Sequence, residues 1–258
     1  MLNIFIGYDP REHDAYDVCR SSLIRHSSEP VLITPLRQGG LRASGLYWRA
    51  SHTNGEGQRI DDVDGTPFST EFSFSRFLVP ELARRNNIHG PVMFVDCDFL
   101  FTGDISRLFD SFETQEDKAV GVVKHNYVPV ARRKMDNCEQ VPYNRKLWSA
   151  LMLFNPWHPA CLKLTPEVVT TSKGSYLHPL QWVDDANIGD LSEEWHWIPD
   201  VSPTTGIARP ALPAGIHYTE GGPWFDHYKN VEFAQEWTQE LALHKAHNTF
   251  NWNNLVTV

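Results

Sequence analysis

Residues 92–101 read VMFVDCDFLF, an apolar run that carries two aspartates one residue apart. The run follows a Gly-Pro pair, and its unbroken apolar start is typical of a central strand in a parallel sheet, which is buried on both faces. Charged side chains are rarely buried unless they are paired or bind a metal. Asp96 and Asp98 therefore mark a polar site at the end of this strand.

Two interpretations of the aspartate pair are open. In an open α/β sheet, ligands bind beyond the carboxyl ends of the strands, and residues i and i+2 of an extended chain point to the same side. Both carboxylates can then converge on one Mg²⁺ or Mn²⁺ ion, since these ions favour oxygen ligands. Alternatively, one aspartate caps the next helix and the other pairs with an arginine such as Arg76. A second Asp-x-Asp, at 62–64, lies in a polar, glycine-flanked segment and is interpreted as a solvated turn.

The surrounding pattern predicts an α/β fold. A strand at 2–7, a helix within 11–27 and a strand at 30–36 form a βαβ unit, which favours a parallel sheet. Residues 37–68 are rich in Gly, Asp, Asn and Arg and are predicted to form a long loop. The other predicted elements are helices at 69–86 (kinked or split at Pro80), 104–112 (capped by Asp104), 165–172, 176–188 and 230–246, and strands within 119–130 and 147–155. No linker or repeat is evident, so a single domain over 1–258 is expected.

Composition excludes several function classes. The 258 residues carry a formal net charge of −9, which argues against general binding to nucleic acid, because that affinity comes largely from Lys and Arg on phosphate. The four cysteines form no CxxC pair, so neither a zinc ribbon nor a disulfide scaffold is indicated. We expect no signal peptide and no transmembrane segment, and hence a reduced, cytoplasmic protein. The basic stretch 131–146 and the aromatic residues near the C-terminus leave a peripheral membrane contact open.

Six segments in order resemble the GT-A-fold nucleotide-sugar glycosyltransferases, most nearly glycosyltransferase family 8, which includes glycogenin and bacterial lipopolysaccharide galactosyltransferases. They span residues 2 to about 225 and read IFIGYDPRE, STEFSFSRFLVPEL, MFVDCDFLF, WSALMLFN, WVDDAN and IHYTEGGPWF. The resemblance implies a GT-A (Rossmann-like) fold with a mostly parallel central sheet flanked by helices. It also implies sugar transfer from a nucleoside diphosphate sugar, with UDP as the expected nucleotide, to a carbohydrate or glycolipid acceptor.

The resemblance assigns three metal ligands. Asp96, Asp98 and His217 would hold Mn²⁺ (or Mg²⁺), which binds the donor diphosphate and stabilises charge on the leaving nucleoside diphosphate. The alternative for His217 is a hydrogen-bonded structural histidine.

The N-terminal segment is the expected nucleotide site. Gly7, Tyr8 and Asp9 follow the first strand, where Tyr8 would stack on the base and Asp9 would accept a hydrogen bond from a ring N–H. Alternatively, these residues only form the turn that starts the helix. Arg76 resembles the family's helix arginine, which faces the donor and the metal carboxylates, and its alternative is a surface salt bridge.

The chain departs from the family pattern around the donor sugar. Trp148 stands where the family has the asparagine that contacts the sugar, and Asp184-Asp185 stands where it has Asp-Gln. Asp184 would bind sugar hydroxyls. A carboxylate beside the anomeric carbon can stabilise an oxocarbenium-like transition state, or it can attack that carbon to form a covalent intermediate. We therefore expect retention of configuration, with Asp185 at the β-face of the donor sugar. The alternative is that these aspartates only cap or pair on a helix.

The family's phosphate-binding lysine before Pro-Trp is absent, and Gly222 occupies its place. Another group would have to replace the positive charge of this lysine. The candidates are the backbone N–H groups of Gly221 and Gly222, the side chain of Lys124, and the basic stretch 131–146. That stretch is also a candidate lid that excludes water from the donor.

Two rival functions are weaker. A sugar-nucleotide nucleotidyltransferase should have a glycine-rich, basic loop after its first strand, whereas GYDPREHD has one glycine and no lysine. A non-catalytic nucleotide- or carbohydrate-binding protein is compatible with the nine tryptophans.

Overall fold

The computed structural model describes the chain except for residues 126–132, 135–137, 140–144, 200, 203–209 and 250–258. Its centre is a six-stranded sheet in the order β12-β8-β11-β6-β1-β2. Neighbouring strands are parallel except where β11 runs antiparallel between β6 and β8, so the expected mostly parallel sheet is confirmed. The strands are β1 (Leu2–Gly7), β2 (Val31–Leu36), β6 (Val92–Val95), β8 (Val120–Val122), β11 (Leu151–Phe154) and β12 (Ile188–Asp190).

The apolar strand at the centre is buried as its sequence predicts. All four residues of β6 are inaccessible to solvent, as are those of its antiparallel neighbour β11. Edge strand β2 instead alternates between half-buried and exposed residues. An unbroken apolar run is therefore stable only in the middle of the sheet, where helices cover both faces.

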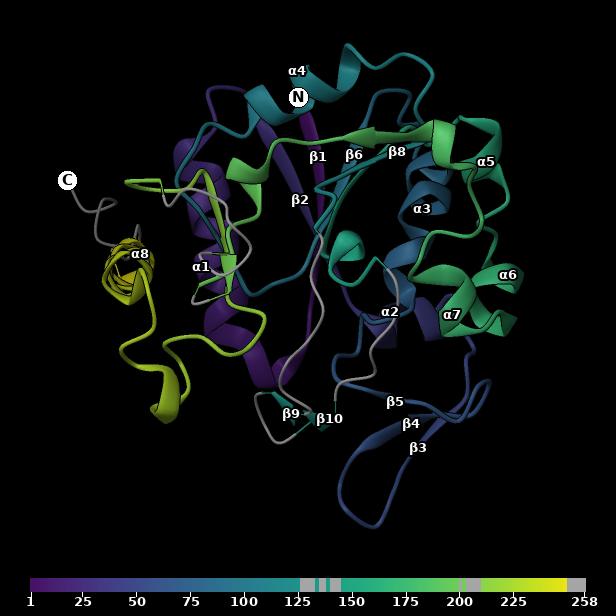
Figure 1. Cartoon of the computed structure of the whole chain (residues 1–258), viewed down its shortest axis with the longest axis horizontal. Helices are drawn as coiled ribbons and strands as arrows, with labels where there is room; N and C mark the ends of the chain where they lie inside the picture. The colour runs from purple at the N-terminus through teal and green to yellow at the C-terminus, as the bar shows by residue number, and fades with distance from the viewer. Residues whose placement is uncertain (126–132, 135–137, 140–144, 200, 203–209, 250–258) are drawn as a thin grey trace, which may run out of the picture.

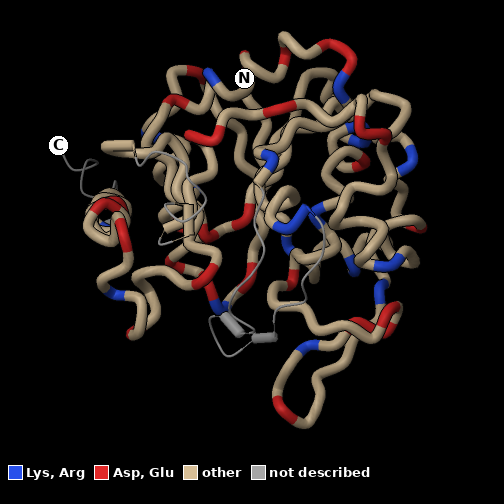
Figure 2. Tube along the Cα trace, viewed as in Figure 1, with Lys and Arg blue, Asp and Glu red and all other residues tan. Residues whose placement is uncertain are grey.

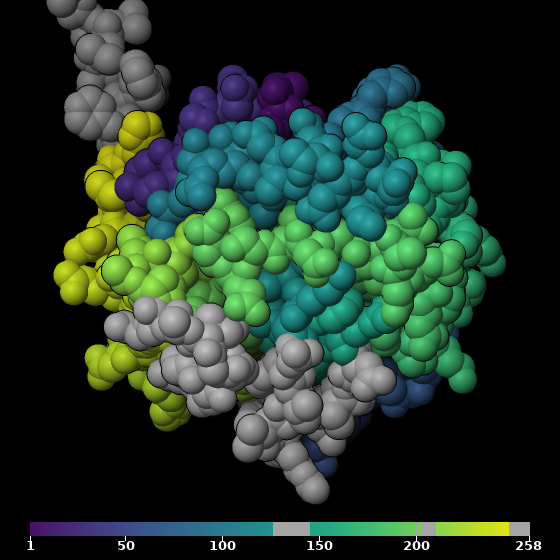
Figure 3. Space-filling model, turned by 45° about the horizontal axis from the view of Figure 1, so that its top comes forward, coloured from purple at the N-terminus to yellow at the C-terminus, as the bar shows by residue number. Residues whose placement is uncertain are grey.

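Helices flank the sheet on both sides (Figure 1). α1 and α8 lie on one side, and α3, α5, α6 and α7 lie on the other. α8 packs against α1, as Figure 3 shows where the yellow C-terminal atoms border the purple N-terminal ones. The helices are α1 (His13–His26), α2 (Gln38–Ala43), α3 (Val79–Arg85), α4 (Ser106–Glu113), α5 (Pro159–Leu162), α6 (Pro166–Thr171), α7 (Gly174–Leu177) and α8 (Ala234–Thr249).

The prediction of a long loop at 37–68 was wrong. This segment contains α2 and a small antiparallel sheet, β3-β4-β5, which lies low in Figure 1. Its strands are β3 (Ser51–Thr53), β4 (Arg59–Asp61) and β5 (Pro67–Phe68). Such short strands carry too few residues for a periodic apolar pattern, so composition alone suggested a loop.

Two predicted helices were too long. Within 69–86 the chain makes turns and a short 3₁₀ helix, Ser75–Leu78, and α3 begins at Val79. Pro80 lies in the first turn of α3, where the missing N–H of proline costs no hydrogen bond. The helix predicted at 176–188 is also wrong, because α7 ends at Leu177 and the chain then turns into β12.

Smaller strands complete the described fold. β7 (Phe99–Phe101) pairs antiparallel with β13 (Gly215–His217), and β9 (Arg133–Lys134) pairs antiparallel with β10 (Cys138–Glu139). The residue at the N-cap of α4 is Ile105 rather than the predicted Asp104, although Asp104 Oδ1 accepts a hydrogen bond from Ser106 N, the first residue of the helix, at 3.1 Å. Acidic and basic residues are interspersed around the described trace (Figure 2). None of the described helices combines the length and the apolar character needed to cross a bilayer.

Candidate active site and metal centre

The predicted polar site lies at one edge of the central sheet. The parallel strands β1 and β6 both end at this edge, and the antiparallel strand β11 begins there, with Leu151 opposite Val95. The backbone N–H of Asp96 donates to Ala150 O at 2.9 Å. Residues that follow β6 and residues that precede β11 are therefore brought together.

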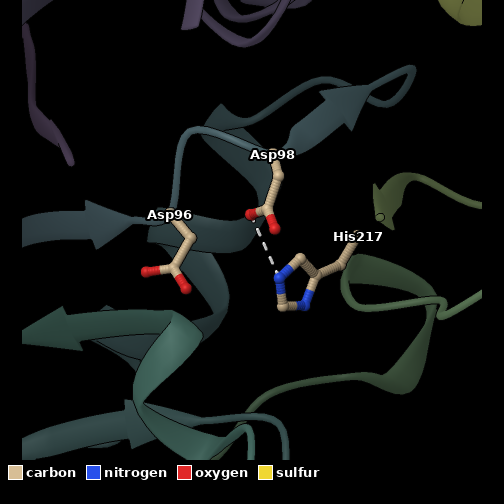
Figure 4. Close-up of side chains that lie close together, drawn as sticks. All are labelled: Asp96, Asp98 and His217. Carbon is tan, nitrogen blue, oxygen red and sulfur yellow. Dashed lines mark ion pairs between the residues drawn. The ribbon is translucent and has the colours of Figure 1, made fainter. Parts of the chain in front are cut away.

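The β7–β13 ladder brings His217 to the aspartates. His217 pairs with Phe99, the residue after Asp98, and its ring stacks on the Phe99 ring at 4.3 Å between centroids. His217 Nε2 lies 3.1 Å from Asp98 Oδ1, and these side chains are only 1% and 7% exposed. Figure 4 shows that Asp96, Asp98 and His217 point into one space from two separate segments.

The three side chains have the geometry and chemistry of a metal site. One ligand atom from each of Asp96, Asp98 and His217 lies within 4.8 Å of the others, the one such group found among the described residues. Two carboxylates and an imidazole suit Mn²⁺, and a buried carboxylate pair is costly unless a cation offsets its charge. The residues present therefore fit the ion that the sequence suggested.

Arg76 lies inside the site, next to Asp96. Its Nη1 lies 2.8 Å from Asp96 Oδ1 and donates to Ser149 O at 2.8 Å. The side chain is buried and lines the cavity in front of the aspartates. The surface-salt-bridge alternative is therefore wrong, because Arg76 holds Asp96 in place from inside the site.

Two further buried histidines adjoin His217. His196 Nε2 lies 2.7 Å from His217 Nδ1, and the His125 ring meets the His196 ring edge to face at 4.3 Å. Burial lowers the pKa of His125 to about 4, with His217 adding to the effect, and burial also lowers the pKa of His196 well below its usual value. Both rings are therefore neutral near neutral pH.

A cavity of about 410 Å³ is lined by Asp96 and Asp98, two of the candidate metal ligands. Its wall combines aromatic rings, three cationic side chains and three carboxylates. The rings are Phe68, Phe72, Phe74 and His178, the cations are Arg76, Lys146 and Lys173, and the carboxylates are Asp64, Asp96 and Asp98. Burial lowers the pKa of His178 to about 3, and the charges of Arg76 and Lys146 add to this. The cavity thus has a neutral imidazole and apolar rings in its wall, together with the charged side chains of Arg76, Asp96 and Asp98.

Asp9 is held by groups of the protein itself in this structure. Its carboxylate is fully buried and accepts hydrogen bonds from Arg11 N and Nε, from Arg59 Nη1 at 2.8 Å and from Glu71 N at 3.1 Å. The acceptor sites are occupied by these groups. Asp9 caps the 3₁₀ turn Pro10–Glu12 that precedes α1, as the alternative expected, and its role toward a nucleotide stays a prediction.

Gly7 and Tyr8 lie close to the site. A Cβ on Gly7 would approach the Phe72 ring to 2.5 Å, so this glycine lets a cavity-lining ring pack on β1. The guanidinium of Arg37 covers one face of the Tyr8 ring at 3.6 Å. Stacking of a base on Tyr8 stays a prediction and would use the other face.

Asp184 and Asp185 are not brought into the cavity. Both are exposed and precede β12, which runs parallel to β8, so they lie near the sheet edge opposite the aspartate pair. Asp185 is 78% exposed and pairs with Arg145 at 2.6 Å. Neither aspartate is among the residues that line the cavity, and their catalytic role stays a prediction.

The residues expected to replace the phosphate lysine contact other parts of the protein, and their phosphate role stays a prediction. Lys124 Nζ donates to Ile188 O and pairs with Asp190 at 2.9 Å, so it ties β8 to β12. Gly221 donates its N–H to Tyr218 O, and Gly222 is buried under the Trp224 ring. None of these residues is among those that line the cavity.

Sequence reasoning missed part of the cavity wall. Asp64, from the Asp-x-Asp interpreted as a solvated turn, accepts a hydrogen bond from Gly174 N at 2.7 Å and lines the cavity. His178 had no motif around it. Lys146 is the cavity-lining residue of the basic stretch 131–146, most of which lies outside the described residues, as do the aromatic residues near the C-terminus. The lid and the peripheral membrane contact therefore stay predictions.

Comparison with known proteins now supplies the family. No family model matches the chain. Protein CDI of Arabidopsis thaliana is 42% identical over 247 residues, which cover 96% of this chain and 88% of CDI. The chain belongs to the CDI family. The alignment therefore covers nearly the whole chain.

Solved structures give the fold of this CDI-family chain. The bifunctional glycosyltransferase WbbM matches over 93% of this chain, with a TM-score of 0.61 and 17% identity. The match covers only 49% of WbbM. The galactosyltransferase LgtC, solved with donor and acceptor sugar analogues, matches with a TM-score of 0.57 and 14% identity over 93% of this chain and 95% of LgtC. The CDI-family chain therefore has the GT-A glycosyltransferase fold, as the sequence resemblance implied.

Proposed function

We propose that the protein is a metal-dependent glycosyltransferase, which moves a sugar from a nucleoside diphosphate sugar to a carbohydrate or glycolipid acceptor. The observation that carries the proposal is the cluster of Asp96, Asp98 and His217, two of which, Asp96 and Asp98, line a cavity of about 410 Å³. The GT-A fold supports it, since LgtC has this fold and was solved with donor and acceptor sugar analogues. UDP is the proposed nucleotide and Mn²⁺ or Mg²⁺ the proposed ion.

Each part of the site has a task in this proposal. A bound divalent ion would supply a Lewis acid that stabilises negative charge on the departing diphosphate. Arg76 fixes the Asp96 carboxylate through its 2.8 Å contact. Lys146 and Lys173 place positive charge in the same cavity, and they replace the missing phosphate lysine better than the more distant Lys124 does.

The apolar wall suits the sugar. Phe72 and Phe74 present rings to the cavity, and the neutral ring of His178 lies between Phe74 and Phe77 at 5.4 Å from each. Closely packed rings exclude water from the site, which protects an activated sugar from hydrolysis.

Retention of configuration is part of the proposal, and because Asp185 is not among the cavity-lining residues we propose a route that does not need it. Among the described residues, the carboxylates at the cavity are Asp64, Asp96 and Asp98. Asp64 is held by Gly174 N and Thr66, and the other two are proposed metal ligands. A front-side displacement, in which the leaving phosphate assists the acceptor hydroxyl, is therefore favoured over attack by a protein carboxylate. Proton NMR of the product checks this, and an inverted anomeric centre contradicts it.

The test is a thermal-shift screen of UDP-sugars with and without Mn²⁺, followed by turnover of the donor that stabilises the protein. We expect stabilisation that needs Mn²⁺ and slow donor cleavage, both lost in Asp98→Ala and both kept in Asp62→Ala. Asp62 is the matched control because it belongs to the other Asp-x-Asp and is exposed. Donor binding that is insensitive to EDTA and to Asp98→Ala would contradict the proposal. Binding without cleavage in any acceptor mixture would instead support a non-catalytic binding protein.

A further inference from the structure

We propose that His196 is a positioning residue that selects the metal-binding tautomer of His217. This inference rests on the proposed function, because it assumes that His217 is a metal ligand. It concerns a residue outside the sequence motifs and beyond the three proposed ligands.

The two nitrogens of His217 face different partners. Nε2 lies 3.1 Å from Asp98 Oδ1 and is therefore the nitrogen that faces the metal site. Nδ1 lies 2.7 Å from His196 Nε2, within hydrogen-bond distance. The ring is 1% exposed, so water does not compete for either position.

The hydrogen-bond chemistry of imidazole then fixes the roles. A neutral imidazole carries one hydrogen, and a nitrogen that binds a metal cannot carry it. If Nε2 of His217 binds the ion, the hydrogen is on Nδ1 and donates to His196 Nε2. The opposite tautomer places a hydrogen on Nε2, pointing at Asp98, where it blocks the metal. An acceptor at the position of His196 Nε2 therefore favours the competent form of His217.

The backbone holds the two rings in this register. Trp197, the residue after His196, pairs with Ile216, the residue before His217. Trp197 N donates to Gly215 O at 2.9 Å, and His217 N donates to Trp197 O at 2.7 Å. Because both residues are fixed by this bridge, the short contact between the rings is built into the fold.

The cost of this arrangement indicates a purpose beyond packing. His196 is fully buried, and its Nδ1 has no hydrogen-bond partner in the described structure. An apolar residue of similar size would avoid this unsatisfied polar atom, whose burial costs free energy. The feature that an apolar residue could not supply is the acceptor for His217 Nδ1–H.

The test is Mn²⁺ affinity, measured from the EPR signal of the free ion without any substrate. His196→Leu removes the acceptor at nearly constant volume, whereas His196→Gln keeps an oxygen near the position of Nε2. We expect roughly 10- to 100-fold weaker Mn²⁺ binding in His196→Leu and a recovery of most of that loss in His196→Gln. Equal affinities in His196→Leu and the wild type would overturn the inference.

Further measurements distinguish a failed role of His196 from a failed metal site and from a variant that does not fold. If the wild-type protein binds no Mn²⁺, or if Asp98→Asn binds it equally well, the proposed metal site fails and not only the role of His196. If His196→Leu does not fold, ¹⁵N NMR of the imidazoles in Mg²⁺-loaded wild type decides, with His217 assigned from His217→Gln. A hydrogen on His217 Nδ1 coupled to His196 Nε2 supports the inference, and a hydrogen on His196 Nε2 overturns it.

Discussion

Arg49 and Asp61 form a buried two-point ion pair, with Nε–Oδ1 and Nη2–Oδ2 distances of 2.6 and 2.7 Å. Arg49 is 2% exposed and also donates through Nη1 to Ser172 O at 2.6 Å, just after α6. The guanidinium lies 3.9 Å from the centroid of the Phe74 ring, which lines the cavity. One side chain thus joins the small β3-β4-β5 sheet, the end of α6 and the cavity wall.

Asp61→Asn should strongly destabilise the protein. The change leaves the buried Arg49 guanidinium without its counter-charge, and breaking one side of a buried ion pair costs about 3–5 kcal/mol. Urea unfolding followed by circular dichroism measures the loss in free energy of unfolding. Asp62→Asn is the control, because the neighbouring Asp62 is exposed and should change stability by less than about 0.5 kcal/mol. Equal losses in the two variants would show that the ion pair is not important for stability.

Asp9 should make stability depend on pH in the acid range. Burial by itself raises the pKa of this carboxyl, but hydrogen bonds and charge from Arg11 and Arg59 outweigh it and bring the pKa from 3.8 to about 2. Since the folded pKa is the lower one, the stabilisation is fully present above the unfolded pKa. It disappears as the pH falls from about 4 to about 2, and is worth about 2 kcal/mol at neutral pH.

The measurement compares the free energies of unfolding of wild type and Asp9→Asn between neutral pH and about pH 2. The difference between the two proteins should be largest near neutral pH and should shrink on acidification. A difference that stays constant with pH would contradict a lowered pKa of Asp9.

Asp185→Asn should leave sugar transfer nearly unchanged. The carboxylate is 78% exposed and its partner is Arg145, so the substitution removes one surface ion pair, worth about 0–1 kcal/mol. We expect kcat and KM for the donor within about two-fold of the wild type, whereas Asp98→Asn should abolish activity. A large fall in kcat for Asp185→Asn alone would restore the catalytic role that the sequence motif suggested.

Gly7→Ala should destabilise the protein and disturb the cavity. The new Cβ would lie 2.5 Å from the Phe72 ring, and overpacking of this kind costs about 1–3 kcal/mol. Adding Phe72→Leu should recover part of the stability, because the smaller side chain makes room. Gly39→Ala is the matched control, since a Cβ there meets nothing within 4 Å and lies in α2. Thermal melts of the variants check the order of stabilities.

Much of the central fold was predictable from local pattern. The strands at 2–7, 31–36 and 92–95 were found because a buried strand is an unbroken apolar run bounded by turn residues. The short strands of 51–68 were missed, since their stability comes from Arg49 and Asp61 rather than from apolar periodicity. A pairing between two charged residues in polar segments leaves no periodic signal in the sequence.

The site was predictable only where strand ends and motifs agreed. Asp96 and Asp98 follow a strand that the sequence clearly marks, and the family resemblance added His217, which the β7–β13 pairing brings to them. Asp184 and Asp185 also matched a motif, but their position depends on the direction of β12. His196 and His178 carried no signal at all, because their roles come from contacts between segments far apart in the chain.

The ladder between β7 and β13 also determines when the site can exist during synthesis. A nascent chain that has left the ribosome only as far as β12 contains both aspartates, but it lacks His217 and the strand that pairs with β7. The two carboxylates then have neither the imidazole nor the full enclosure that favours a cation. Under the proposed function, the three ligands are complete only once translation has passed β13, the last strand in the described part of the chain.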